Sequence, residues 1–223
     1  MKNILIGGVI ILTSILAPQI VRAQGTMTYL SNLGQQPDGS NAVGSDSWLA
    51  ATFYTGSNAN GYSLDSIQLR MADASGNPGD FTVMLYTATG TGGIFPGSSL
   101  GTLDGSLNPT TAGIYTYTPA SSITLSPGTP YFVVLTAGTA VANGAYEWSV
   151  MNTASYNPVD NWLGAVTLSS KNGLSWTTLP TYPQMDFSQF AINATPIPEP
   201  GVLGLLGLGG LAFLWHRRKV KAV

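Results

Sequence analysis

Cysteine is absent from this chain of 223 residues, and histidine occurs only once, as His216. Without cysteine the protein can form neither a disulfide nor a thiolate nucleophile, so its stability must come from packing. Because His216 lies close to the C-terminus, residues 24–195 contain neither histidine nor cysteine. That region therefore cannot build a Ser-His-Asp or Cys-His catalytic device, nor a zinc site with histidine or cysteine ligands.

Charged side chains are also scarce and make up only 8% of the residues. Between residues 24 and 195, two basic residues, Arg70 and Lys171, stand against nine acidic ones, which gives a net charge of −7. A region with so few basic residues lacks the positively charged surface that binds the phosphates of nucleic acid. Its carboxylates leave one enzymatic chemistry open, the carboxylate pair of glycosidases, and Glu147 is the acid that we would test first. The simpler interpretation of Glu147 is a polar residue on the outer face of a strand.

Long apolar runs are confined to the two ends of the chain. At the N-terminus, Lys2 precedes an apolar run over residues 4–16, and Val21-Arg22-Ala23 follows with residues that suit signal peptidase. Residues 1–23 are therefore predicted to be a secretory signal peptide. The alternative is a retained N-terminal anchor.

The C-terminal run, residues 202–215, carries no charge and is rich in glycine. As a helix it would span roughly 21 Å, which is short for a hydrocarbon core that takes about 20 residues. The prolines of Pro198-Glu199-Pro200 should keep the preceding segment extended. The run is followed by a basic tail, residues 216–221, which the positive-inside rule keeps in the cytoplasm through Arg217, Arg218, Lys219 and Lys221. These features predict a transient membrane anchor that is held until it is cut.

In this order at the extreme C-terminus, the three parts of residues 196–223 resemble the PEP-CTERM sorting signal. The resemblance implies recognition by an exosortase, a membrane-embedded, transpeptidase-like cysteine protease of Gram-negative bacteria that form exopolysaccharide. It also implies delivery to the cell surface or the extracellular matrix. The alternatives are an ordinary C-terminal anchor and a buried helix.

Apolar and polar residues alternate with period two in many short segments, such as residues 66–71 and 81–86. Turn sequences such as Gly76-Asn77-Pro78-Gly79 separate these segments. The pattern predicts one all-β domain over residues 24–195, with a β-sandwich or jelly-roll fold, joined to the tail by a short linker at 193–200. Further predicted strands are 28–33, 48–55, 114–118, 122–125, 131–135, 146–150, 162–168, 174–179 and 186–192.

Several of these segments together resemble an exported bacterial domain called choice-of-anchor R. That family implies a β-sandwich-like exported domain and brings no catalytic motif. The segments that carry the resemblance are 48–57, 62–70, 81–86, 96–97 and 125–135.

One turn has the composition of a cation site. Asp73, Ser75, Asn77 and Asp80 place oxygen atoms at positions i, i+2, i+4 and i+7 of a glycine-bearing loop, which suits Ca²⁺. The loop lacks the bidentate glutamate of an EF-hand, and the same residue types favour an ordinary hairpin. Calcium is thus the one cofactor that the sequence suggests, against an interpretation with none.

Tryptophan supplies the remaining candidates. Trp162 and Trp176 lie beside turns, where exposed rings could stack on sugars, whereas Trp48 and Trp148 lie in alternating strands and are predicted to be core. We therefore expect a non-enzymatic, structural or adhesive protein of the surface or the exopolysaccharide matrix. A carbohydrate-binding module is the first alternative, and a glycosidase-type enzyme the second.

Overall fold

The computed structural model describes residues 25–92, 94–153, 155–179 and 186–198. Within these ranges the chain forms a 14-stranded sheet and one 3₁₀ turn, η1 (Val141–Asn143), without an α-helix, so the predicted all-β class is confirmed. The strands are β1 (Met27–Ser31), β2 (Gly39–Val43), β3 (Trp48–Tyr54), β4 (Tyr62–Gly76), β5 (Thr82–Thr89), β6 (Phe95–Asp104), β7 (Gly113–Pro119), β8 (Thr124–Leu125), β9 (Pro130–Thr136), β10 (Gly144–Met151), β11 (Leu163–Ser170), β12 (Thr177–Thr178), β13 (Phe187–Ser188) and β14 (Phe190–Pro196).

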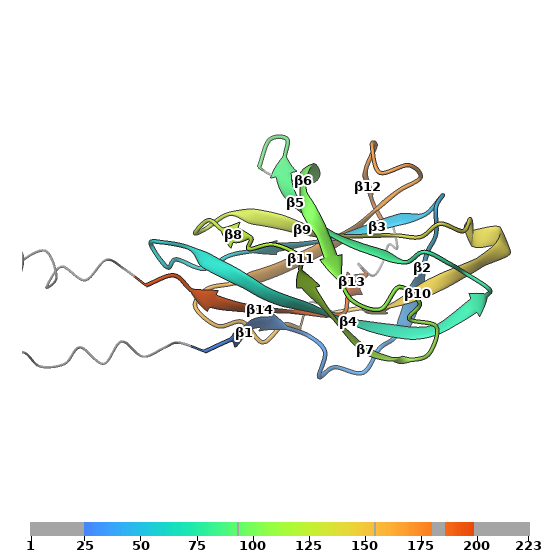
Figure 1. The fold of residues 1–223 in the computed structure, drawn as a ribbon, viewed down its shortest axis with the longest axis horizontal. Helices are drawn as coiled ribbons and strands as arrows, with labels where there is room; N and C mark the ends of the chain where they lie inside the picture. The colour runs from blue at the N-terminus through green and yellow to red at the C-terminus, as the bar shows by residue number, and fades with distance from the viewer. Residues whose placement is uncertain (1–24, 93, 154, 180–185, 199–223) are drawn as a thin grey trace, which may run out of the picture.

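The strands form one continuous sheet that curls on itself (Figure 1). Its main path runs β1-β14-β4-β7-β6-β5-β9-β3-β11-β12, and β10 extends the β4 half by pairing with β2, β4 and β13. The halves join where β6 meets β7, through the pairs Leu103–Pro119 and Asp104–Thr118. The finer prediction of a sandwich or jelly roll is not confirmed, because this corner makes the two halves parts of a single sheet.

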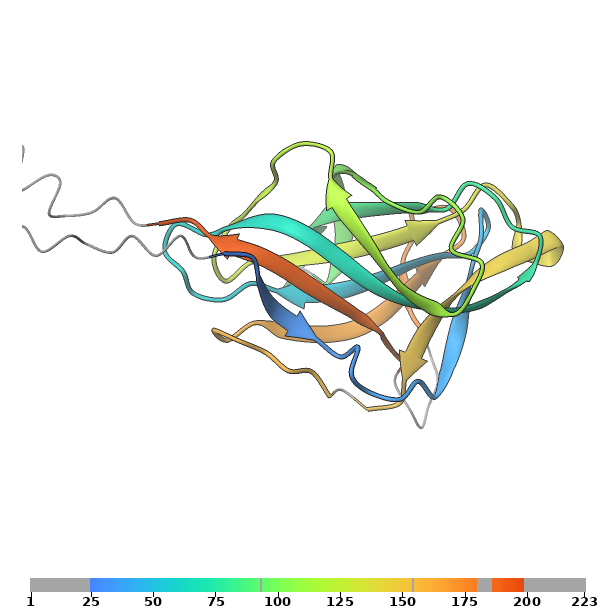
Figure 2. The same ribbon diagram turned by 60° about the horizontal axis from the view of Figure 1, so that its bottom comes forward.

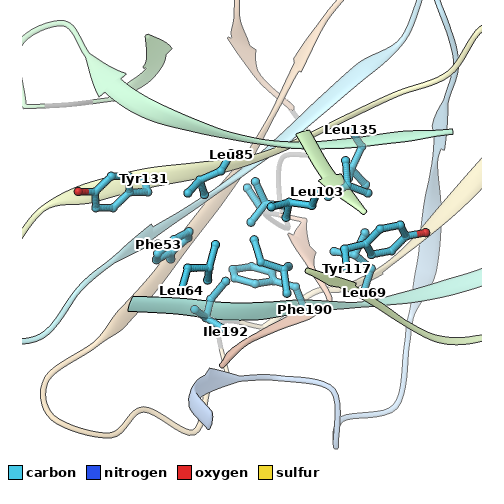
Figure 3. Close-up of a cluster of buried hydrophobic side chains, with 14 of the residues drawn as sticks. Phe53, Leu64, Leu69, Leu85, Leu103, Tyr117, Tyr131, Leu135, Phe190 and Ile192 are labelled. Carbon is cyan, nitrogen blue, oxygen red and sulfur yellow. The ribbon is translucent and has the colours of Figure 1, made fainter. Parts of the chain in front are cut away.

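The core lies between the two halves of the curled sheet (Figure 3). Alternation puts Leu85 and Tyr131 on the inner face of one half, and Leu64, Phe190 and Ile192 on that of the other. All five side chains are almost fully buried. The core is therefore built by the period-two pattern that the sequence shows.

Some strand boundaries differ from the prediction. Residues 95–97 begin β6 although they include Pro96 and Gly97, and β2 lies outside the predicted strands. β4 continues past Asp73 and Ser75 to Gly76 because β10 pairs with it there, through Ala145–Ser75 and Gly144–Gly76. These two residues thus lie in a strand, which corrects the prediction of a loop.

The predicted linker at 193–200 is also corrected, because β14 runs through Pro196 and pairs with both β1 and β4. Figure 2 shows these three strands side by side, with the start of β1 and the end of β14 at the same end of the molecule. Both termini of the described body therefore leave from one end.

The predicted signal peptide (1–23), the apolar run (202–215) and the basic tail (216–221) lie outside the described residues. In the described part of the chain, no helix has the length and apolarity to cross a membrane.

Candidate functional site

The segment that leads to Pro198-Glu199-Pro200 is hydrogen-bonded to the turn before β4. The amide N–H of Ile197 donates to the carbonyl of Gly61 at 3.0 Å. The side-chain amide of Asn58 donates to the Ile197 carbonyl at 3.2 Å, and that of Asn60 donates to the Pro198 carbonyl at 2.8 Å. The body therefore holds the main chain up to the first residue of the proposed motif. Glu199 and Pro200 lie outside the described residues.

The turn over residues 58–61 is itself tightly fixed. Gly61 has φ +76°, and a Cβ added there would lie 2.2 Å from the Leu125 carbonyl oxygen, so only glycine fits. The amide N–H of Asn58 donates to the Tyr62 hydroxyl at 3.1 Å, and that hydroxyl donates to the Asp160 carboxylate. Burial, followed by the bond to Asp160, raises the pKa of Tyr62, so the phenol stays protonated and the hydrogen bond that it donates to Asp160 persists to alkaline pH.

Trp162, a predicted sugar-stacking residue, is fully buried. Its ring lies parallel to Phe53 with centroids 5.8 Å apart, stacks on Tyr29 and meets the edge of Tyr62. A ring covered on these sides cannot stack on a ligand, which corrects the interpretation of Trp162. Its Nε1 is buried and makes no hydrogen bond of regular geometry, although the Tyr62 hydroxyl lies beside the indole.

Trp176, the second predicted sugar-stacking residue, is half-buried and lies outside the main core. It packs against a second apolar cluster on the outer face of β3, β9 and β11. The buried members of this cluster, which we call the outer cluster, are Ala50, Phe132, Val134 and Leu168. The half-buried side chains around it are Trp48, Met84, Tyr86, Ala88, Phe95 and Trp176.

The outer cluster follows directly from strand pairing. Leu168, Ala50, Val134 and Met84 are successive cross-strand partners, and the next pair along is Phe132–Tyr86. Neighbours in register share a face of the sheet, so these side chains form one continuous surface. Figure 1 shows the β5–β6 hairpin and β12 projecting from the same side of the molecule. The result is a sheet face whose rim carries aromatic rings.

Trp48 was predicted to be core but belongs to this rim. Its Nε1 donates to the Ser45 carbonyl at 3.1 Å, and a Cβ added at Gly173 would lie 2.8 Å from its ring. One part of the indole is therefore covered by the β11–β12 turn. Trp148, by contrast, is fully buried, as predicted, and its Nε1 donates to the Gln189 carbonyl at 2.9 Å.

The predicted calcium ligands have separate neighbours. The Asp73 carboxylate accepts the Ala112 amide N–H at 2.8 Å, whereas the Asp80 carboxylate lies against Gly138. Among the described residues, no three His, Cys, Asp or Glu side chains gather in a way that could hold a metal ion. Asn77 is exposed in the turn between β4 and β5, and Asp80 adopts a φ of +58° there.

Two further polar features lie at the surface. Glu147 lies on β10, where its carboxylate accepts the Ser40 hydroxyl at 2.9 Å on an exposed face. A groove of about 630 Å³ is lined by residues of β2, β3, β11 and β12, among them Asn41, Ser169 and Asn172. Its lining is mostly small hydroxyl and amide side chains, with Asp46 and Lys171 as the charged members.

Sequence reasoning missed Asn58 and Asn60, which contact residues 139 and 138 positions away. An Asn-Ala-Asn-Gly turn is common before a strand, and nothing in it indicates a partner near the C-terminus. Tyr86 and Phe95 were also missed as members of the outer cluster. The local sequence pattern does not show which face of a strand other parts of the chain cover.

Comparison with known proteins identifies the tail alone. The family described as the PEP-CTERM protein-sorting motif matches residues 196–219. No curated protein and no solved structure matches the chain. The tail thus indicates exosortase-dependent export and a surface location, by way of a membrane-anchored precursor.

Proposed function

We propose that this chain is a protein of the cell surface or exopolysaccharide matrix of a Gram-negative bacterium, with a structural or adhesive rather than an enzymatic role. Signal peptidase removes residues 1–23, and residues 202–215 anchor the precursor transiently in the membrane. The sorting enzyme then acts at Pro198-Glu199-Pro200. The β-sheet body is the part that remains at the cell surface or in the matrix.

One observation carries the proposal, namely that the sorting motif begins where the body ends. The match starts at Pro196, the last residue of β14, so no separate domain lies between the β-sheet and the tail. Whatever the tail delivers is therefore the body itself. The body is acidic and weakly charged, which suits solubility outside the cell.

The body is also proposed to be a domain of the choice-of-anchor R type. The segments that carry that resemblance include residues 48–57, 62–70 and 125–135. In the fold they supply β3, the first part of β4 and β9, which pack on the same core. Because the segments that carry the resemblance pack together in one hydrophobic core, they support the assignment of the body to this type of domain.

Replacing Glu199 by alanine tests the delivery step. The Glu199→Ala precursor should stay uncut in the membrane fraction of the native cell, whereas Asp104→Ala, a matched change at an exposed residue of the body, should be processed normally. Intact-mass measurement of the cell-surface protein reports the outcome. Wild-type protein that still carries residues 202–223 at the surface would refute delivery by processing.

Cells that make Glu199→Ala should also lose adhesion or matrix cohesion to the same degree as cells without the gene. Normal cohesion in both strains would contradict the structural or adhesive role.

Carbohydrate binding is a second candidate function, favoured by the rim of the outer cluster. Trp48, Tyr86, Phe95 and Trp176 are half-buried, so each has an apolar surface in contact with solvent. The C–H groups of a sugar ring can cover such surfaces, and the half-buried Thr136, which follows Phe132 and Val134 on the same face of β9, adds a hydroxyl nearby.

The test uses exopolysaccharide from the native cell as the probe, in affinity electrophoresis. Trp176→Ala should abolish retardation with little change in melting temperature. Leu174→Ala is the control, because Leu174 is two residues away but 83% exposed. Equal retardation of both variants and the wild type would exclude this surface as a sugar site.

A further inference from the structure

The residues that lead into the sorting motif are held by two side-chain amides, of which Asn58 also donates to the Gly61 carbonyl of its own turn. Asn60 Nδ2 reaches the Pro198 carbonyl at 2.8 Å, and Asn58 Nδ2 reaches the Ile197 carbonyl at 3.2 Å. Both donors come from the turn over residues 58–61, and Glu199 follows Pro198 in the chain. The last fixed carbonyl of the body is thus one residue from the glutamate of the motif.

The chemistry of the held segment explains why amide donors are used. Pro196 and Pro198 have no N–H, so only their carbonyls remain as main-chain groups that the body can bind. Pro198 also confines Ile197 to an extended conformation. An asparagine side chain supplies a donor to such a carbonyl without adding charge, and the Ile197 N–H completes the set through the Gly61 carbonyl.

We propose that Asn58 and Asn60 are positioning residues for tail processing, because they hold Ile197 and Pro198, the two residues that precede Glu199 in the chain, against the folded body. The inference rests on the proposed function, in which the tail is cut. It adds that the sorting enzyme meets the motif together with the end of the folded body, and not as an isolated peptide.

The length of chain involved brings that end of the body close to the membrane. Four residue steps separate Pro198 from Val202, the first residue of the apolar run, and they reach at most about 14 Å. When the apolar run is in the membrane, Pro198 must lie within that distance of its first residue, and the turn over residues 58–61, which is hydrogen-bonded to Pro198, lies close by. Its neighbours there include residues 125–128, since Gly61 packs on the Leu125 carbonyl and Gly128 N–H donates to Gly56 at 2.9 Å.

Pre-ordering the segment favours cleavage because a protease binds an extended chain. Ordering the backbone of one residue at the moment of binding would slow the reaction by about tenfold. Loss of the Asn60 bond should therefore reduce the rate of processing by about that factor, while the fold of the body is unaffected.

The experiment follows processing of the full-length precursor by pulse-chase in the native cell. Asn60→Asp keeps the shape of the side chain but cannot donate, and it should be cut about tenfold more slowly. Asn60→Gln keeps the donor and should be cut at nearly the wild-type rate. Asn143→Asp is the matched control, because it adds the same charge at an exposed residue beyond the other end of β4.

Exchange of the Ile197 amide hydrogen provides an independent readout. In Asn60→Asp it should accelerate, while the melting temperature stays that of the wild type. Wild-type processing of Asn60→Asp overturns the inference, and so does equal slowing by Asn143→Asp or by Asn60→Gln. If the wild-type chain is never cut, the proposed function itself is contradicted. That result differs from all the outcomes that contradict only the role of Asn58 and Asn60.

Discussion

Trp162 is held by three aromatic neighbours rather than by its polar atom. Phe53, Tyr29 and Tyr62 lie around its ring at centroid distances of 5.8, 5.1 and 5.0 Å, and Phe53 in turn stacks on Tyr131. The indole Nε1 is buried and makes no hydrogen bond of regular geometry, so dispersion and burial supply what this residue contributes.

Truncation of this ring should therefore be costly. Trp162→Ala is expected to lower the free energy of unfolding by about 3–5 kcal/mol, since it removes a fully buried aromatic side chain and leaves a cavity. Urea denaturation of the processed protein measures the change. Trp176→Ala, at a half-buried position, should lose clearly less, and equal losses in the two variants would contradict the distinction between core and rim.

The two tryptophans also show what a sequence can predict at this scale. Both lie beside turn residues, so local pattern treats them alike. Tyr29 and Phe53 cover Trp162, and they come from strands more than 100 positions away in the chain. Residue type and periodicity predict Trp148 as core, but they cannot supply neighbours that only the folded sheet brings together.

At the scale of elements, the strand predicted over residues 186–192 is broken in two at Gln189. β13 pairs with β10, whereas β14 pairs with β1 and β4. Asn32 secures the break, because its side chain donates to the Ser188 carbonyl at 2.9 Å and accepts the Phe190 N–H at 2.8 Å. Trp148 and Asn32 impose this break from distant parts of the chain, so the alternation within residues 186–192 gives no sign of it.

Asn32→Ala should destabilise the protein because two buried main-chain groups lose their hydrogen-bond partner. The Ser188 carbonyl and the Phe190 N–H would both be left buried without partners, at about 1–3 kcal/mol each. The measurement is the melting temperature of Asn32→Ala compared with that of Asn143→Ala, a control change at an exposed residue. A melting temperature as high as that of the control would mean that water or another group replaces the amide.

For the molecule as a whole, buried tyrosines set the response to alkaline pH. Burial raises the pKa of Tyr29, Tyr62, Tyr117, Tyr146 and Tyr156 above the ordinary value of 10.0. Below pH 10 both the folded and the unfolded chain keep these protons, so the tyrosines do not reduce the free energy of unfolding. Above it the unfolded chain releases protons that the folded chain retains, so stability must fall as the pH rises.

The expected result is a constant free energy of unfolding up to about pH 10 and a steep loss beyond. Circular dichroism and tyrosine ultraviolet absorbance are followed together through a pH titration, and the part of the absorbance change that these five tyrosines cause should coincide with the loss of the β-sheet signal. Full ionisation near pH 10 while the β-sheet signal persists would show that these hydroxyls are not buried.

The sequence alone predicted the all-β class and the sorting tail, because period-two alternation and the order of three terminal features are local properties. Curling of the sheet depends on the meeting of β6 and β7, two strands whose joint is only two residue pairs wide. The turn at Asn58 and Asn60 contacts a segment of remote sequence. Both depend on tertiary closure, which local patterns do not encode.

The pairing of β1 with β14 also dictates when the body can finish folding. Met27 lies opposite Ala194, so the first strand waits for the last, and β4 likewise lacks its β14 neighbour until then. A chain that leaves the cell from its N-terminus thus crosses almost completely before this high-contact-order closure can occur. Under the proposed route of export, the apolar run would by then be at the membrane, and the protein would complete its native state as a tethered molecule.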